Sequence, residues 1–370
     1  MTGGSLFEKA CAASPSCVKF PSVGTPRFNV VNRTLPLVTF DKEDQRPTAS
    51  VVITCFTEQR LSDIFEAVTS VRRQILPPNE IILVVDSNRK LYERLKGGMD
   101  RSVHVVLNEG VRGISAARNV GIGLAQSNLV AFLDDDAVAD PEWLLRLTEL
   151  FRDPDVAAGG GRAVLQWSEG RPAWFPEELD WTVGGSVSWG PLERTVVRNP
   201  HGFSMCFRRE VFEAMGNFAV DLGNIGETYR GGEEVELCLR MAHRWPAAKV
   251  VWEPGAVVIH KIPASKATLP AIMRRAYYEG FQKRWIRLTA PTKDAGRVLS
   301  TERGYLKHLL GRALPSRLRY FWRPKDLLQA GMIILCVAAT GVGYLLGTTR
   351  NKTFYSRSAR RIGRGSSRAG

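Results

Sequence analysis

The sequence predicts an α/β fold in which a mostly parallel sheet is covered by helices on both faces. Between residues 49 and 150, short apolar runs alternate with amphipathic segments, the order expected when each strand is followed by a helix. The apolar runs are continuous, as in strands that are buried on both faces. They also end in polar, mostly acidic residues, and ligands of such sheets bind beyond the carboxyl ends of the strands.

The first half of this fold contains four predicted strands and the helices between them. The strands are expected at residues 50–56, 80–86, 103–109 and 129–135, and the helices at 61–74, 88–97 and 113–125. A further helix is expected to open at Asp140-Pro141-Glu142, with the aspartate as its cap and the proline in its first turn.

Residues 157–260 are less regular and are predicted to form the second half of the same domain, with a strand at residues 249–261. This stretch is rich in tryptophan, at Trp167, Trp174, Trp181 and Trp189. These rings could stack on an acceptor sugar, and packing in the core would account for them equally well.

The positive charge of the chain is concentrated at its C-terminal end. The formal net charge is +14, but residues 291–370 hold 16 Lys and Arg against three Asp and Glu, so the remainder is nearly neutral. No base-reading module accompanies this charge, which favours anionic lipid headgroups over nucleic acid as the partner. The six cysteines have neither metal-ligand nor disulfide spacing, which fits a reducing, cytosolic environment.

One segment without charged residues, Leu327 to Gly347, is long enough to cross a bilayer, since about 20 residues suffice. Basic residues flank both of its ends, so the positive-inside rule assigns no orientation. We expect this segment to bind the membrane. A spanning and a re-entrant arrangement are both compatible with its length, and a buried core helix is the alternative.

These features divide the chain into five parts without internal repeats. They are an irregular N-terminal arm (1–46), the α/β domain (47–265), a basic helical region (266–325), the hydrophobic membrane segment (326–348) and a basic tail (349–370).

Three adjacent carboxylates, Asp134, Asp135 and Asp136, follow the apolar run of the fourth predicted strand. Such carboxylates repel one another unless a cation neutralises them, and oxygen ligands suit Mg²⁺ or Mn²⁺ better than zinc. A cation held there would bridge a diphosphate and stabilise the charge that grows on it as it leaves. A solvated acidic turn would explain the triplet alone equally well.

Two further carboxylates, Glu233 and Glu234, are predicted to occupy the first turn of a helix that follows two glycines and runs to Trp245. The helix dipole favours ionised carboxylates at this end, a form that can accept a proton. Helix capping is the alternative explanation. The sequence contains neither a dinucleotide-binding G-x-G-x-x-G motif after a strand nor a P-loop, which disfavours both of those enzyme classes.

Five segments occur together in the order and spacing of one known family: SVVITCFTE, EIILVVDSN, GISAARNVGIGLA, VAFLDDD and GGEEVELCLR. Over residues 50–260 the chain resembles the family 2 glycosyltransferases, and within them the polyprenyl-linked sugar transferases. The resemblance implies a GT-A-type nucleotide-binding fold with a mostly parallel central sheet, followed by a C-terminal helical membrane-associated segment.

The resemblance also implies roles for individual residues. Those expected to contact the nucleotide sugar are Thr54, Phe56, Glu58, Asp86, Arg118, Asp134 and Asp135. Asp136 would bind Mn²⁺ or Mg²⁺, with Asp134 and His260 as further ligands. Glu234 would be the general base. Because the family has Asp rather than Glu at this second position, Glu233 is kept as the alternative base.

These roles imply an inverting, metal-dependent glycosyltransferase. An acceptor hydroxyl would lose its proton to Glu234 while it attacks the anomeric carbon of a nucleotide-sugar donor. The acceptor is expected to be lipid-linked or a polysaccharide at the cell membrane, with the catalytic domain facing the cytoplasm. One alternative, a sugar nucleotidyltransferase of related fold, would leave Glu234 without a role. The other is a membrane-bound, non-catalytic binding protein.

Overall fold

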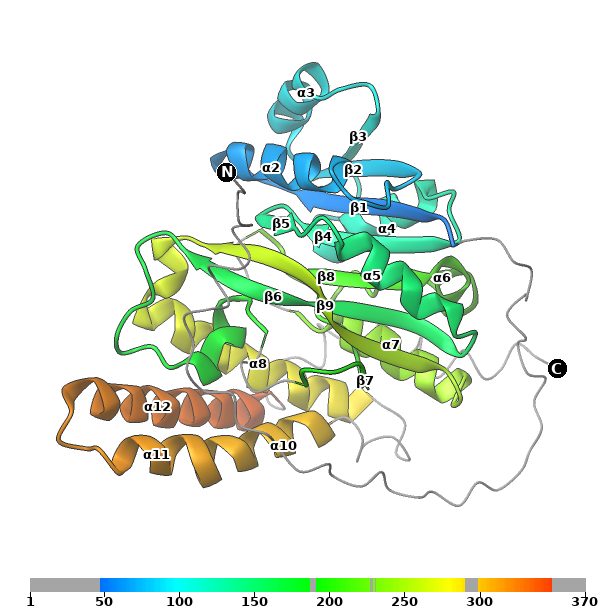
Figure 1. Ribbon diagram of the computed structural model, residues 1–370. Coiled ribbons are helices and arrows are strands. Elements are labelled where there is room, and N and C mark those ends of the chain that lie inside the picture. Colours follow the sequence, from blue (N-terminus) through cyan, green and yellow to red (C-terminus); the bar gives the residue numbers. More distant parts are fainter. Residues whose placement is uncertain (1–46, 187–190, 227–228, 230, 290–298, 348–370) are drawn as a thin grey trace, which may run out of the picture. The chain divides into compact units, whose positions relative to one another are not determined.

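The computed structural model describes residues 47–186, 191–226, 229, 231–289 and 299–347 (Figure 1). The chain divides into two compact units, Met1–Thr39 and Phe40–Gly370, and every described residue belongs to the second. The predicted N-terminal arm and the predicted basic tail lie outside the described residues.

The described strands form one mixed sheet. They are β1 (Ala49–Cys55), β2 (Glu80–Asp86), β3 (Val103–Asn108), β4 (Leu129–Asp134), β5 (Ala137–Ala139), β6 (Val156–Trp167), β7 (Thr195–Val196), β8 (Ser204–Arg208) and β9 (Lys249–Ile262). The order across the sheet is β3-β2-β1-β4-β8-β6-β9-β5, and β7 pairs with β9. The first four strands are parallel to one another, whereas β8 is antiparallel to both of its neighbours.

Helices cover both faces of this sheet. They are α2 (Leu61–Arg72), α3 (Arg89–Gly98), α4 (Ile114–Leu124), α5 (Trp143–Glu149), α6 (Arg209–Met215) and α7 (Glu233–Arg244). On β1, Val51 and Ile53 belong to a core built with α2, α3 and α5, whereas Val52 belongs to a second core built with α4, α6 and α7. Because consecutive strand residues point to opposite faces, a strand covered on both sides must be apolar throughout.

The prediction of strands and helices in the first half is confirmed to within two residues at each end. α5 begins at Trp143, two residues after Pro141. The Asp140 carboxylate accepts a hydrogen bond from the backbone N–H of Glu142 at 3.0 Å, so it closes a turn before the helix instead of capping it. The strand β5 was not predicted, because three residues are too few to show a periodic pattern.

Among the described residues, the α-helices that follow the sheet are α8 (Leu269–Thr289), α10 (Ser300–His308), α11 (Leu314–Leu318) and α12 (Pro324–Leu346). In Figure 1, α10 and α11 run antiparallel to α12 and form a hairpin with it. Among the described helices, α12 is long and apolar enough to cross a membrane, by length and composition. Within residues 266–325, the part of the chain that the structure describes is largely helical.

α12 packs closely against α8. A Cβ atom added to Gly280 of α8 would overlap the backbone of Thr340, and one added to Gly343 of α12 would overlap the backbone of Tyr277. Such contacts require glycine because the two helix backbones nearly touch. Cys336 of α12 also joins a buried cluster that contains Ile272 of α8 and apolar residues that precede β7. α12 is therefore attached along one side to the same unit as the sheet.

Candidate active site

A cavity of about 1850 Å³ opens at the carboxyl edge of the parallel strands. Thr54 near the end of β1, Asp86 at the end of β2 and Asp134 at the end of β4 all line it. Thr54 and Asp134 are also register neighbours in the sheet. Pockets for single ligands typically measure roughly 300–1,000 Å³, so this cavity has room for two substrates.

The acidic triplet is held by cations of the protein itself. Nη1 of Arg60, in the turn after β1, lies 2.7 Å from Oδ1 of Asp135 and 3.0 Å from Oδ2 of Asp136. Nζ of Lys266 lies 3.0 Å from Oδ2 of Asp136. A metal ion is therefore not required to offset the repulsion among the three acids, because Arg60 and Lys266 supply part of the neutralisation.

Burial acts on two members of the triplet with different outcomes. Burial raises the pKa of Asp135, and the Arg60 guanidinium offsets this only in part. Burial would raise the pKa of Asp136 as well, but the cationic groups around it, His260 first, outweigh this and hold the pKa well below its ordinary value. Asp136 is therefore the ionised member of the pair, as a metal ligand must be.

Asp134, Asp136 and His260 offer ligand atoms that lie within 4.8 Å of one another. Nδ1 of His260 lies 2.8 Å from the carbonyl oxygen of Gly184, which can only accept, so Nδ1 carries the proton. Nε2 faces Oδ1 of Asp136 at 2.8 Å and donates to it in the protonated form of the ring that lowers the pKa of Asp136, so a metal ion would have to replace that proton. Histidine ligands usually donate their other ring nitrogen to such a carbonyl. The residues fit a divalent cation, and the imidazole favours Mn²⁺ over the oxygen-bound Mg²⁺.

Arg118 of α4 connects the acidic triplet to α7. Its Nη2 lies 3.2 Å from Oδ1 of Asp134 and 2.8 Å from the carbonyl oxygen of Gly202, and its Nη1 lies 2.7 Å from Oε1 of Glu233. The side chain is almost fully buried. One guanidinium thus sets the spacing between a carboxylate of β4 and a carboxylate of α7. These three contacts give Arg118 a positioning role, and its predicted contact with the nucleotide stays a prediction.

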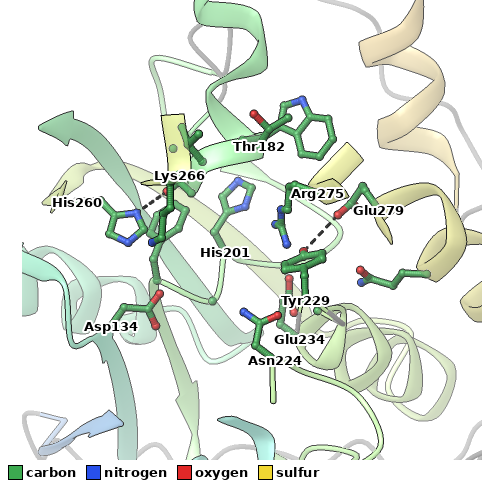
Figure 2. Close-up of a pocket in the computed structure, with 18 of the residues that line it drawn as sticks. Asp134, Thr182, His201, Asn224, Tyr229, Glu234, His260, Lys266, Arg275 and Glu279 are labelled. Atoms are coloured by element: carbon green, nitrogen blue, oxygen red, sulfur yellow. Dashed lines mark hydrogen bonds between the residues drawn. The ribbon is translucent and has the colours of Figure 1, made fainter. Parts of the chain in front are cut away.

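Glu234 lines the cavity from the first turn of α7. The turn before it depends on Gly231 and Gly232, whose φ angles of 37° and 83° favour glycine. Burial and, next, the Glu233 carboxylate raise the pKa of Glu234 to about 8. Glu233 is bound to Arg118, so Glu234 is the carboxylate better suited to accept a proton. Figure 2 shows Glu234 across the cavity from Asp134 and His260.

Of the seven residues predicted to contact the nucleotide sugar, all but Glu58 line the cavity. Asp86 accepts hydrogen bonds from the backbone N–H of Gly113 at 2.9 Å and from the side chain of Asn108 at 2.8 Å. Phe56 lines the cavity, whereas Glu58 does not and pairs instead with Lys90 at 2.8 Å. The predicted role of Glu58 therefore has no support from this geometry.

Two cations at the site, Arg60 and Lys266, were not predicted. Arg60 follows a predicted strand end by four residues, so its position was a usable signal. Lys266 lies on a turn after β9, and only the fold brings it to the triplet. Of the four tryptophans singled out in the sequence, Trp167 and Trp181 line the cavity, and Trp189 lies outside the described residues. Nε1 of Trp181 donates a hydrogen bond to the hydroxyl of Tyr305 at 2.7 Å.

Comparisons with known proteins identify the family of this chain. Residues 50–216 match the family model described as glycosyl transferase family 2. A glucosyl-dolichyl phosphate glucuronosyltransferase of Haloferax volcanii is 30% identical over 304 residues, which cover 80% of this chain and 95% of that relative. This chain belongs to glycosyl transferase family 2. A pre-mycofactocin glycosyltransferase of Mycobacterium tuberculosis is 30% identical over 183 residues, which cover 50% of this chain and 37% of that relative.

The fold of this glycosyltransferase also resembles a solved structure. The mannosyltransferase PcManGT from Pyrobaculum calidifontis, in complex with GDP-Man and Mn²⁺, superposes with a TM-score of 0.52 at 16% identity, over 85% of this chain and 91% of that one. The predicted GT-A fold is confirmed, with a mixed sheet. Family membership removes the support for the nucleotidyltransferase and for the non-catalytic binding protein.

Proposed function

We propose that this family 2 glycosyltransferase moves a sugar, with inversion at the anomeric carbon, from a nucleotide-sugar donor to a hydroxyl of a lipid-linked acceptor. The observation that supports it most is that one cavity holds the Asp134, Asp136 and His260 group together with Glu234. Arg118 holds the two sides of this cavity together through Asp134 and Glu233.

In this proposal each side of the cavity has one task. Mn²⁺ bound by Asp134, Asp136 and His260 would stabilise negative charge on the departing diphosphate. Arg60 and Lys266 add positive charge beside the same position. Glu234, on the opposite side, takes the proton of the acceptor hydroxyl as that oxygen attacks the anomeric carbon. One displacement completes the transfer, so no covalent intermediate on the protein is needed.

The name of the Haloferax volcanii relative suggests which substrates to test first. That protein is a glucuronosyltransferase whose name gives glucosyl-dolichyl phosphate as its substrate. We therefore propose a uronic-acid nucleotide sugar as the donor and a glucosyl polyprenyl phosphate as the acceptor.

The proposal predicts that one nucleotide sugar in a panel will yield nucleoside diphosphate in the presence of Mn²⁺ and a glucosyl polyprenyl phosphate. Chromatography of the nucleotide products measures this release. The control reaction supplies a nucleoside triphosphate and a sugar 1-phosphate instead. Pyrophosphate formed in that control, with no diphosphate released from any nucleotide sugar, would contradict the proposal.

We also infer that α12 lies in the membrane surface rather than across the bilayer, with the catalytic domain on the cytoplasmic side. Near its start, Gln329 donates a hydrogen bond to the carbonyl oxygen of Ala173 at 2.9 Å, and near its end Tyr344 binds Arg287 of α8 at 2.6 Å. Polar groups of the main unit thus contact α12 near both of its ends, and a charged group such as Arg287 cannot enter hydrocarbon without a large cost.

The opposite side of the hairpin suits a lipid surface. Its exposed apolar residues are Leu310, Leu318, Phe321, Trp322, Leu327, Leu328, Ile334, Leu335, Val342, Leu345 and Leu346. Arg319, Arg323 and Lys325 lie among them in the sequence, where they can meet anionic headgroups. Such an arrangement is typical of helices that lie in the membrane interface.

Replacing Phe321 and Trp322 together by Ser is expected to weaken binding to vesicles that contain anionic lipid by roughly tenfold to a hundredfold, because two exposed aromatic side chains lose contact with the lipid. Both residues are 63% exposed. Vesicle co-sedimentation measures the effect, and Ile75→Ser, which alters a residue that is 62% exposed near the sheet, is the control. If α12 instead spans the bilayer, the double variant should sediment with the vesicles as the wild type does and should resist extraction by alkaline carbonate.

A further inference from the structure

The cavity continues past Glu234 toward the membrane-binding helices. On that side it is lined by Arg275, Glu279 and Lys283 of α8 and by Val337 and Thr340 of α12. Figure 2 shows Arg275 and Glu279 on the same side as Glu234, away from Asp134, His260 and Lys266. This part of the cavity therefore lies between the proposed base and the apolar helix, and not beside the proposed metal ligands.

Most charged groups in this part of the cavity have partners of opposite charge. Nζ of Lys283 lies 3.1 Å from Oε1 of Glu279 and 2.9 Å from Oε1 of Glu302. Arg198 binds Glu302 with two hydrogen bonds of 2.8 and 2.9 Å. These two carboxylates are thus already engaged by Lys283 and Arg198.

Arg275 differs from these cations. Its Nη1 is buried and has no hydrogen-bond partner among the described residues. The nearby Glu279 is engaged by Lys283 and accepts a hydrogen bond from the hydroxyl of Tyr229 at 3.4 Å. The Tyr229 ring lies against the guanidinium, with 3.2 Å between its centroid and the guanidinium carbon. Burial lowers the pKa of Arg275 to about 10, so the group is still cationic at neutral pH.

A buried cation without a hydrogen-bonded anion is costly unless a ligand supplies that anion. Nη1 of Arg275 is a donor that can bind a phosphate oxygen, and the guanidinium geometry matches phosphate. The anion should also be joined to an apolar group, because Val337 and Thr340 of the membrane-binding helix line the same space.

We propose that Arg275 binds the phosphate group of a polyprenyl-phosphate-linked acceptor and so directs the acceptor sugar toward Glu234. This proposal rests on the proposed function and adds to it a subsite and the ligand chemistry that the subsite selects. The other source of a phosphate would be the diphosphate of the donor, and binding experiments can tell the two apart.

The test compares the binding of farnesyl phosphate and farnesol to the full chain in detergent by titration calorimetry. The wild-type protein is expected to bind farnesyl phosphate about tenfold to a hundredfold more tightly than farnesol, as charged hydrogen bonds imply. Arg275→Met should abolish this preference, and Arg275→Lys should restore part of it. The control is Arg284→Met, since Arg284 lies on the same helix but does not line the cavity, and it should keep the preference.

A nucleotide-sugar titration with Mn²⁺ accompanies each variant, both to show that the protein is folded and to identify the source of the phosphate. Unchanged donor binding in Arg275→Met supports the proposal. Loss of donor binding together with an intact preference for farnesyl phosphate would assign Arg275 to the donor and overturn it, as would a wild-type protein that does not distinguish farnesyl phosphate from farnesol.

Turnover separates this inference from the proposed function. If wild-type protein transfers sugar to a glucosyl polyprenyl phosphate, Arg275→Met should raise the KM for that acceptor at least tenfold and leave the KM for an alkyl glucoside, which lacks phosphate, unchanged. An equal rise for both acceptors would reject the phosphate subsite while the proposed function stands. If Arg275→Met selectively lost farnesyl phosphate binding but the wild-type protein transferred no sugar, the phosphate subsite would stand and the proposed function would be rejected.

Discussion

Glu234→Gln is expected to lower kcat by about 10²- to 10⁴-fold, the usual contribution of a general base. The amide has nearly the same shape as the carboxylate but cannot take the proton of the acceptor hydroxyl. Donor binding should change little, because Glu234 lies across the cavity from Asp134 and His260 (Figure 2). The measurements are single-turnover transfer and calorimetric titration of the nucleotide sugar.

The matched variant Glu233→Gln distinguishes the two candidate bases. Glu233 is hydrogen-bonded to Arg118, so we expect its loss to disturb the position of Arg118 and to lower activity less than the loss of Glu234 does. Full loss of turnover in Glu233→Gln with activity retained in Glu234→Gln would assign the proton transfer to Glu233.

The pH dependence of the reaction offers an independent check on Glu234. Burial and then the charge of Glu233 raise the pKa of Glu234 to about 8, so the basic, ionised form is present above that pH and is lost as the pH falls. The acid limb of kcat/KM should therefore lie near pH 8 in the wild-type enzyme. Removing the neighbouring charge with Glu233→Gln should move this limb to lower pH. A profile that stays flat down to pH 6 in the wild type would contradict the assignment.

The parallel half of the fold could be predicted because each strand shows a local sequence pattern. The strand β2, for example, is apolar from Ile81 to Val85, as expected where helices cover both faces, and polar residues mark each of its ends. In the second half, the strand predicted at residues 249–261 is present as β9 (Lys249–Ile262), but the other strands lack such signals. β8 has only five residues and pairs antiparallel with strands distant in sequence, so its partners depend on the assembled sheet rather than on a local pattern.

The residues of the site likewise include some that short sequence motifs predict and some that only the fold brings to the cavity. The acids Asp134 to Asp136 and Glu234 stand in short motifs beside strand and helix ends, where sequence order is enough to place them. Arg275 lies in the middle of a helix in a region predicted only to be basic and helical, and only the packing of α8 against the cavity makes it a candidate ligand.

The sequence shows three adjacent acids, but the pairing of Arg60 and Lys266 with them depends on the fold, because these cations are distant from the acids in the sequence. Mutual repulsion among the acids is therefore weak evidence for a metal ion. The position of His260 is better evidence, since one ring nitrogen is held by Gly184 and the other faces Asp136.

Asp136→Asn is expected to weaken Mn²⁺ binding by roughly a hundredfold or more, since changes to groups that only support a metal ligand already cost ten- to a hundredfold. The amide keeps the shape of the side chain but removes the charge that both His260 and the metal ion require. Counting free Mn²⁺ by electron paramagnetic resonance measures the affinity directly. Chelation of the metal should abolish transfer in the wild type.

The neighbouring variant Asp135→Asn is the control that shows whether the loss of Mn²⁺ affinity is specific to the proposed metal ligands. Asp135 is equally buried and also contacts Arg60, but it is not among the three residues whose ligand atoms converge. Its replacement should leave Mn²⁺ affinity within a few fold of wild type while raising the KM for the donor, because Arg60 would lose one of its two anchoring carboxylates. If both variants lost the metal equally, the acidic triplet would act through its total charge, and the assignment of Asp134, Asp136 and His260 as the ligands would have to be given up.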